Sequence, residues 1–374
     1  MFKRLIRVFV LCTLFAFSHS LELSNSETNF LFSVKDNTAG QYFYDYNRFR
    51  TEINEQSDTF SWKGIFDLET FMGEQYLKSA SYLAARQQQL NLPLYPYLYL
   101  NDGQQLNARL YLYRLYGTWQ NGPHNLTLGI QRIPFGVGRL WNPTDRFNPV
   151  NALSIEKEER LGVFGLNYTY YSDNLSYLQL LTNLDNFGAI DKYGLRYKSH
   201  FSDIDAAFSY IMSDSFNMNG LELEGNLLNT GMEVRSEIGY FNDYANNNLY
   251  VRGILGFDYG FPNMVSLAVE YYYNGSGADN ILNYNSSTLT PDNPYLGRHY
   301  LGVMLSYMFD PLSTISTTGV LNILDSSFFT GLTLSRSLND NLILNLGASL
   351  FNGSSGSEFS TYSGSYFLQI AMFF

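Results

Sequence analysis

The chain has 374 residues, of which 34 are acidic and 23 basic, so its formal net charge is −11. This acidity argues against a nucleic-acid partner, because binding phosphates requires an excess of lysine and arginine. Tyrosine and phenylalanine are abundant, but after the first twenty residues no unbroken apolar stretch approaches the ~18 residues of a membrane-spanning helix, which excludes helical membrane proteins.

The first segment has the parts of a secretory signal peptide. Three basic residues within positions 3–7 precede an apolar run over 8–17, and small residues lead up to Ser20. We therefore expect residues 1–20 to be removed, which leaves a mature domain over 21–374. The run is too short to span a bilayer as a helix. The one cysteine, Cys12, lies inside it, so the mature chain would have no disulfide and no thiolate metal site.

Apolar and polar residues alternate along most of the mature chain. The clearest examples are the segments 232–240, 265–273 and 342–350. Alternation over this length indicates a strand with one apolar and one polar face. A tilted strand needs about 9–11 residues to cross a bilayer, so the pattern favours a transmembrane β-barrel over a soluble sandwich.

Eighteen segments fit this description, with sixteen as the alternative because the first and the fourth segment are ambiguous. They are 29–35, 41–53, 60–71, 105–119, 125–133, 159–171, 174–184, 190–199, 203–213, 220–228, 231–241, 249–259, 263–273, 299–309, 314–325, 328–337, 341–351 and 362–374.

The lengths of the links between these segments support the count of eighteen. Links after even-numbered segments are all short, whereas links after odd-numbered segments include the four long ones, 72–104, 134–158, 274–298 and 352–361. Short turns on one rim and long loops on the other are typical of outer-membrane barrels, whose turns face the periplasm. One strand more or fewer would scatter the long loops over both rims.

The chain ends in an alternating strand with a terminal aromatic residue. In this respect it resembles bacterial outer-membrane β-barrel proteins of the porin type. The resemblance implies a location in the outer membrane, contact with its lipid and lipopolysaccharide, and recognition by the barrel-insertion machinery. The strand number is also similar to that of alginate-exporting barrels, but their lumen is strongly basic. The assembly signal would consist of Tyr366, Leu368, Ile370 and Phe374.

An eighteen-stranded barrel is wide enough to enclose an aqueous channel, and the polar strand faces predict a wet lumen. The charges on these faces either solvate the wall or sort permeant ions; we expect the first role for most single residues. The expected wall residues are Arg48, Arg50, Glu52, Lys192, Arg196, Lys198, Asp203 and Asp205.

The link 134–158 is rich in proline, glycine and charge. Asn142-Pro143-Thr144-Asp145 predicts a type I turn, and Gly136 and Gly138 permit close backbone approach. In position and charge the link resembles the third loop of porins, which folds inward and narrows the lumen; the alternative is a loop on the outer rim. By the resemblance, Arg132, Arg139 and Arg146 would face the acids across a constriction that comprises Arg132, Arg139, Asp145, Arg146, Glu156, Glu158, Glu159 and Arg160.

The link 72–104 contains a stretch of helical character, 76–87, and an aromatic run, 93–99. The aromatic run could contact solutes, but a latch onto a neighbouring subunit or a cap over its own barrel is the more common role of such a loop.

These features predict a porin, a passive diffusion channel for ions and small hydrophilic solutes. The alternatives are a barrel dedicated to an oligosaccharide or polysaccharide, and a non-conducting structural or adhesive barrel. We expect no enzyme, cofactor or metal site, because His124, His200 and His299 fall singly near the rims and no metal-ligand spacing occurs. Net acidity favours cations and the arginine cluster favours anions, with the balance expected toward cations. Homotrimers are common among porins, but the sequence displays no interface.

Overall fold

The computed structural model describes residues 21–36, 40–90, 96–173, 175–228, 230–244, 246–290 and 292–374. The expected signal peptide lies outside these residues, so its cleavage after Ser20 stays a prediction. No helix within the described ranges is long and apolar enough to cross a membrane.

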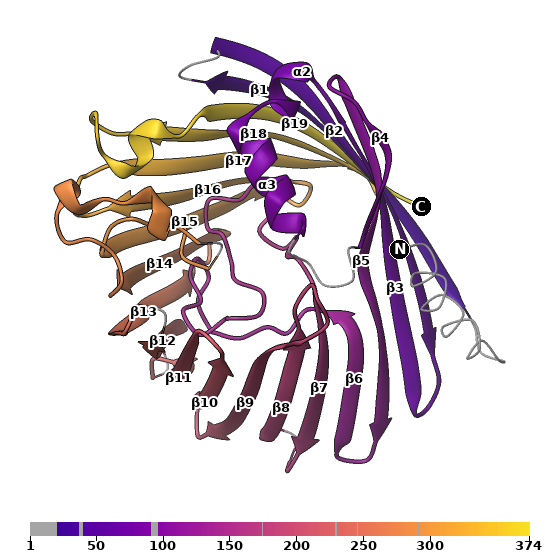
Figure 1. Ribbon diagram of the computed structural model, residues 1–374, viewed down its shortest axis with the longest axis vertical. Coiled ribbons are helices and arrows are strands. Elements are labelled where there is room, and N and C mark those ends of the chain that lie inside the picture. Colours follow the sequence, from indigo (N-terminus) through magenta and orange to yellow (C-terminus); the bar gives the residue numbers. More distant parts are fainter. Residues whose placement is uncertain are drawn as a thin grey trace.

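The described residues form one antiparallel sheet that curls into a ring (Figure 1). Its strands are β1 (Glu22–Asp36), β2 (Gly40–Gln56), β3 (Phe60–Met72), β4 (Tyr97–Asp102), β5 (Leu106–Asn121), β6 (His124–Gln131), β7 (Val163–Tyr171), β8 (Tyr177–Leu184), β9 (Ile190–Phe201), β10 (Ile204–Ser213), β11 (Phe216–Asn226), β12 (Met232–Asp243), β13 (Asn248–Gly260), β14 (Val265–Asn274), β15 (His299–Asp310), β16 (Ser313–Asn322), β17 (Phe328–Asn339), β18 (Leu342–Asn352) and β19 (Gly364–Phe373).

The first and last strands pair with each other and close the barrel. β1 pairs with β2 on one side and with β19 on the other, in a register that runs from Ser26 opposite Phe373 to Lys35 opposite Gly364. Closure is what hydrocarbon requires, because an open edge would leave a row of backbone groups without partners. The closed barrel has 18 strands, which confirms the predicted count and excludes sixteen.

The short strand β4 is not part of the closed ring. It pairs with the upper part of β5, beyond the reach of β6, and β5 also pairs with β3. The link 72–104 was expected to hold no strand, so β4 was missed. The first strand was also predicted too short, since β1 begins at Glu22 rather than near position 29.

Side chains alternate between the two faces of the wall, as the sequence pattern predicts. In β12, Glu237 and Phe241 are buried on the inner side, whereas Ile238 and Tyr240 are 46% and 43% exposed on the outer side. Other strands repeat this arrangement with outward leucines and tyrosines. Tyr366 and Phe374 are likewise exposed at the two ends of β19; their role as an assembly signal remains a prediction.

Long connections gather at one rim. They carry α2 (Glu74–Leu77), α3 (Ala80–Leu90) and the 3-10 turns η1 (Ile281–Asn283), η2 (Ser286–Thr288) and η3 (Glu358–Thr361). The helices confirm the helical character predicted for this part of the link 72–104. Tyr76 of α2 stacks on Tyr44 of β2 with 3.7 Å between ring centroids, so the segment packs onto the inner face of its own barrel near the mouth (Figure 1).

Candidate functional site

The connection between β6 and β7, residues 132–162, runs through the interior of the ring of strands (Figure 1). We call it the inner loop. Asn148 ties its two ends together, because its side-chain oxygen accepts the N–H of Ile133 and its amide donates to the carbonyl of Leu161, both at 2.6 Å. The N–H of Asp145 donates to the carbonyl of Asn142 at 3.1 Å, which closes the predicted turn.

Two glutamates of the wall hold the backbone of the inner loop. Glu270 of β14 accepts the N–H groups of Arg139, Leu140 and Trp141 at 2.9, 3.1 and 2.9 Å. Glu237 of β12 accepts the N–H groups of Val137 and Thr144, and the hydroxyl of Thr144 as well. Hydrogen bonds to a carboxylate are roughly twice as strong as neutral ones, so these residues act as anchors.

Glycines provide the space for this close approach. Gly136 has a φ of +85°, and a Cβ on it would lie 2.5 Å from Oδ1 of Asn142 and 2.6 Å from Oε2 of Glu237. On the wall, a Cβ at Gly302 of β15 would lie 2.3 Å from a methyl carbon of Leu140. The predicted close approach at Gly136 is therefore present, and a glycine of the wall receives the loop.

Apolar side chains of the inner loop pack against the wall on two sides. Leu140 and Trp141 belong to a buried cluster with residues of β13–β17, where the Trp141 ring stacks on Tyr272 at 5.3 Å. Ile133, Phe135 and Phe147 belong to a second buried cluster with residues of β8–β12. The loop is therefore fixed along one half of the lumen.

The charges predicted to form a constriction mostly pair with the wall instead of with each other. Among the described residues, two ion pairs join members of the predicted constriction: Arg132–Glu158 at 3.1 Å and Arg160–Asp145 at 3.6 Å. The other charged residues of the predicted constriction pair with residues outside it. Arg139 pairs with Asp258 at 2.9 Å and Arg146 with Asp292, while Glu156 pairs with Arg48 at 2.7 Å and Glu159 with Arg50 at 2.9 Å.

Asp145 does not face a solute path, which corrects its predicted place. It is only 1% exposed, accepts the N–H groups of Phe147 and Asn148, and has Arg160 at 3.6 Å. Burial raises the pKa of Asp145 to about 6, although these donors and Arg160 favour the carboxylate. Its role is to shape the turn inside the loop.

Most of the predicted wall residues lie on the inner face, in ion pairs. Arg48 and Arg50 bind the inner loop as described. Asp203 was placed wrongly: it lies in the turn between β9 and β10, exposed at the short-turn rim, because β10 begins only at Ile204. The other pairs are Glu52–Lys63 and Lys198–Asp205, both at 2.7 Å, together with Lys192–Asp191 and Arg196–Glu222.

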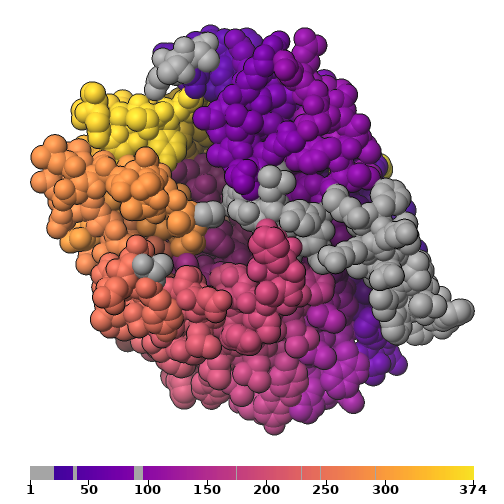
Figure 2. All heavy atoms as spheres, in the orientation of Figure 1, coloured from indigo at the N-terminus to yellow at the C-terminus, as the bar shows by residue number. Residues whose placement is uncertain are grey.

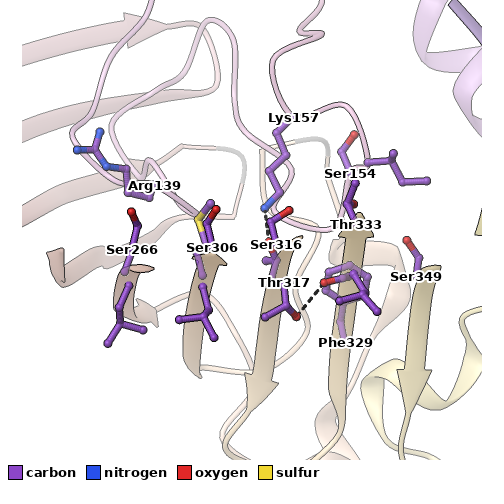
Figure 3. Close-up of a pocket in the computed structure, with 18 of the residues that line it drawn as sticks. Arg139, Ser154, Lys157, Ser266, Ser306, Ser316, Thr317, Phe329, Thr333 and Ser349 are labelled. Atoms are coloured by element: carbon purple, nitrogen blue, oxygen red, sulfur yellow. Dashed lines mark hydrogen bonds between the residues drawn. The ribbon is translucent and has the colours of Figure 1, made fainter. Parts of the chain in front are cut away.

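Two cavities remain beside the inner loop, and they meet at one place. The outer cavity, of about 550 Å³, opens between α2, α3 and the strands β1–β3 and β18–β19; Figure 2 shows this face hollowed between the C-terminal part and the segment that carries the helices. The inner cavity, of about 530 Å³, lies along β13–β19 (Figure 3). Both are lined by Ser154 and Ile155 of the loop and by Ser349 of β18. We call this place the junction.

The inner cavity has a hydroxyl-rich wall with one lysine above it (Figure 3). Lys157 of the inner loop donates to the hydroxyl of Thr318 at 3.0 Å. Among the described charged residues that line the two cavities, Lys157 alone has no oppositely charged group within ion-pair distance. Burial lowers the pKa of Lys157 to about 8, against the opposing effect of Glu270. The hydroxyls belong to Ser154, Ser266, Ser306, Ser316, Thr318, Thr333 and Ser349.

If the barrel conducts ions, the pKa of Lys157 should make its preference between anions and cations depend on pH. Below a pKa of about 8 the ammonium is charged and would attract anions to the inner cavity; above it, the neutral amine would not. Raising the pH from about 6.5 to about 9.5 should therefore shift the reversal potential in the direction that indicates greater permeability to cations, with the midpoint of the change near pH 8. Lys157→Arg should keep the low-pH selectivity throughout. An equal shift in Lys157→Met would show that another group titrates.

Comparisons with known proteins rest on structure alone, because no protein-family model matches the sequence and no curated protein is similar to it in sequence. OccAB4 of Acinetobacter baumannii superposes with a TM-score of 0.62 over 96% of this chain and 99% of its own, at 11% identity. The outer membrane protein OpdK of Pseudomonas aeruginosa gives 0.62 over 95% and 98%, at 10% identity. The fold is that of an outer-membrane porin. A BenF-like porin of Pseudomonas fluorescens Pf-5 agrees, with 0.60 over 95% and 98%, at 13% identity.

The porin fold does not determine which solute a barrel admits, because the side chains that line the lumen differ from one sequence to another. At 10–13% identity, the residues of the junction and its neighbourhood have to be interpreted from their own contacts. Among the described residues there is no group of histidine, cysteine, aspartate and glutamate that could hold a metal ion.

Proposed function

We propose that this porin-fold protein is a passive diffusion channel of the bacterial outer membrane for ions and small hydrophilic solutes. The observation that carries the proposal is the pair of cavities that meet at Ser154, Ile155 and Ser349. A barrel with a purely structural or adhesive role would gain nothing from adjoining cavities beside a loop anchored by two glutamates of the wall. The inner loop would then set the width of the passage.

The lining favours small polar solutes, with a preference for anions. Hydroxyl groups can replace the hydration of a polar solute, and the arginines along the cavities are matched by carboxylates. Lys157 then supplies the unmatched charge beside the junction, which reverses the cation preference expected from the net charge of the chain. One solved structure of OpdK contains vanillate, a small aromatic acid, and a channel of similar architecture is consistent with solutes of that size.

A carbohydrate-specific channel is a weaker candidate. The aromatic rings of the outer cavity stack on one another, as in the pairs Tyr44–Tyr76 and Phe32–Tyr44, so these rings do not offer a free face for a sugar.

Planar-bilayer recordings of the refolded mature chain under a salt gradient test the proposal. We expect stepwise conductance, and at neutral pH a reversal potential whose sign indicates a preference for anions. Barrel folding is checked in parallel by the shift in electrophoretic mobility on heating. A folded barrel without any conductance would contradict the channel and favour the structural alternative.

A further inference from the structure

The inner cavity contains a row of hydroxyl groups that crosses four neighbouring strands. Ser266 of β14 is the register partner of Ser306 of β15, which in turn pairs with Ser316 of β16; Ser316 then pairs with Thr333 of β17. All four line the cavity, and the three serines lie side by side on neighbouring strands in Figure 3. Neighbouring strands lie about 4.8 Å apart, so the row is roughly 14 Å long. We call it the hydroxyl row.

The hydroxyls of this row have no hydrogen-bond partner within the described part of the chain, and the same holds for the hydroxyl of Ser349 nearby. Register partners on the wall elsewhere do bond to each other, as Thr118 of β5 and Thr127 of β6 do at 3.0 Å. Ser349 is only 7% exposed, yet it lines both cavities. Because a hydroxyl both donates and accepts, these groups are open to a partner that enters the cavity.

The row carries no charge and ends at a glycine on each side. Beyond its ends the register continues to Gly260 of β13 and to Gly347 of β18. A Cβ at Gly347 would lie 2.2 Å from Cζ of Phe367, so the ring of Phe367 covers this end of the row. Near the other end, Arg139 and Asp258 pair with each other at 2.9 Å. The row therefore offers a solute hydrogen bonds and not charge.

We propose that the hydroxyl row binds small linear polyols, of the sugar-alcohol type, as they pass through the inner cavity. The inference rests on the proposed channel function and names one class of solute for it. A linear polyol carries hydroxyls at regular intervals, and each of them donates and accepts, so it can bond to several positions of the row at once. A carboxylate only accepts, and the charge of Lys157 rather than the row would hold it.

The direction of the row suits passage as well as binding. Strands of such barrels tilt by about 35–45° from the barrel axis, so a row across them runs obliquely along the lumen and not around it at one height. A polyol can exchange one hydroxyl partner for the next while its hydration is replaced throughout. A linear polyol needs no free aromatic face, so the stacked rings of the outer cavity do not argue against it.

Two uncharged probes of nearly equal mass test the inference in planar-bilayer recordings of the refolded mature chain. Xylitol carries a hydroxyl on every carbon, whereas triethylene glycol has ether oxygens along its chain, which only accept. Xylitol should lower the ion conductance saturably, because a polyol bound in the inner cavity obstructs the ions. At equal concentration the reduction should be about twofold larger for xylitol than for triethylene glycol.

A variant without hydroxyls in the row identifies the site. The triple variant Ser306→Ala, Ser316→Ala and Thr333→Val should raise the apparent dissociation constant of xylitol about tenfold, since several hydrogen bonds are lost together. The double variant Thr118→Val and Thr127→Val removes hydroxyls of the wall outside both cavities and should bind xylitol like the unaltered protein. Folding of each variant is checked by the shift in electrophoretic mobility on heating.

The outcomes separate this inference from the channel function. A conducting protein that both probes inhibit equally, or a triple variant that xylitol inhibits as before, would overturn the polyol site and leave the channel function standing. A folded barrel without conductance would overturn both. Saturation-transfer NMR of the refolded protein in micelles gives a readout without ion flow: xylitol signals no stronger than those of triethylene glycol would also overturn the polyol site.

Discussion

Replacing Glu270 by alanine should raise the single-channel conductance about twofold or more and make the current noisier. Its carboxylate accepts three consecutive N–H groups of the inner loop, from Arg139 to Trp141. Without the carboxylate, each buried N–H donor left unpaired destabilises the docked loop by about 1–3 kcal/mol. This part of the loop should therefore move away from the wall and fluctuate over a larger range. Glu270→Ala and Glu237→Ala combined should have a larger effect than either alone.

Single-channel recordings at high salt measure this effect, with Glu52→Ala as the control. Glu52 is also a carboxylate of the inner wall, but it pairs with Lys63 and not with the inner loop. A conductance of Glu270→Ala equal to that of the unaltered protein and of Glu52→Ala would mean that the loop does not limit the current.

Lys157→Glu should convert the preference for anions into one for cations. The substitution changes the charge beside the junction by two units. For an ion several ångströms away, at an effective dielectric constant between those of protein and water, this is worth about 1–3 kcal/mol. The anion-to-cation permeability ratio should therefore fall by about tenfold or more.

Reversal potentials under a salt gradient provide the measurement, at neutral pH. Lys35→Glu changes the same charge at the end of β1 and should leave the ratio almost unaltered, because charges outside the passage are screened by salt. A ratio in Lys157→Glu within the error of that in Lys35→Glu would place the path of ions elsewhere.

The fold could be predicted because one face of each strand contacts lipid and the other contacts water, so apolar and polar residues alternate within every strand. In segments such as 232–240, every second residue must suit hydrocarbon, so the sequence itself records the inner and outer faces. The strand β4 escaped this reasoning because it is only six residues long and, among the described strands, pairs with β5 alone. Boundaries also shifted where polar residues continue a strand beyond the membrane, as at the start of β1.

The inner loop could be predicted from its composition, but the partners of its charges could not. Arg139 pairs with Asp258, which lies 119 residues further along the chain, and this depends on the path that the loop takes through the barrel. Glu237 and Glu270 were visible as polar residues of alternating strands, yet nothing local marks them as acceptors for backbone groups. Lys157 stands out only when all the neighbouring charges are seen to be paired.

Thiol modification during recording tests the central claim most directly: solutes pass the junction on the β18 side, while the loop seals the side of β10–β12. Ser349 lines both cavities, whereas Ser209 of β10 is fully buried, with a Cβ at the adjacent Gly220 only 2.8 Å from Thr144 of the loop. A charged methanethiosulfonate reagent should reduce the current through Ser349→Cys and leave Ser209→Cys unaffected. Block of Ser209→Cys, with Ser349→Cys insensitive, would contradict the account.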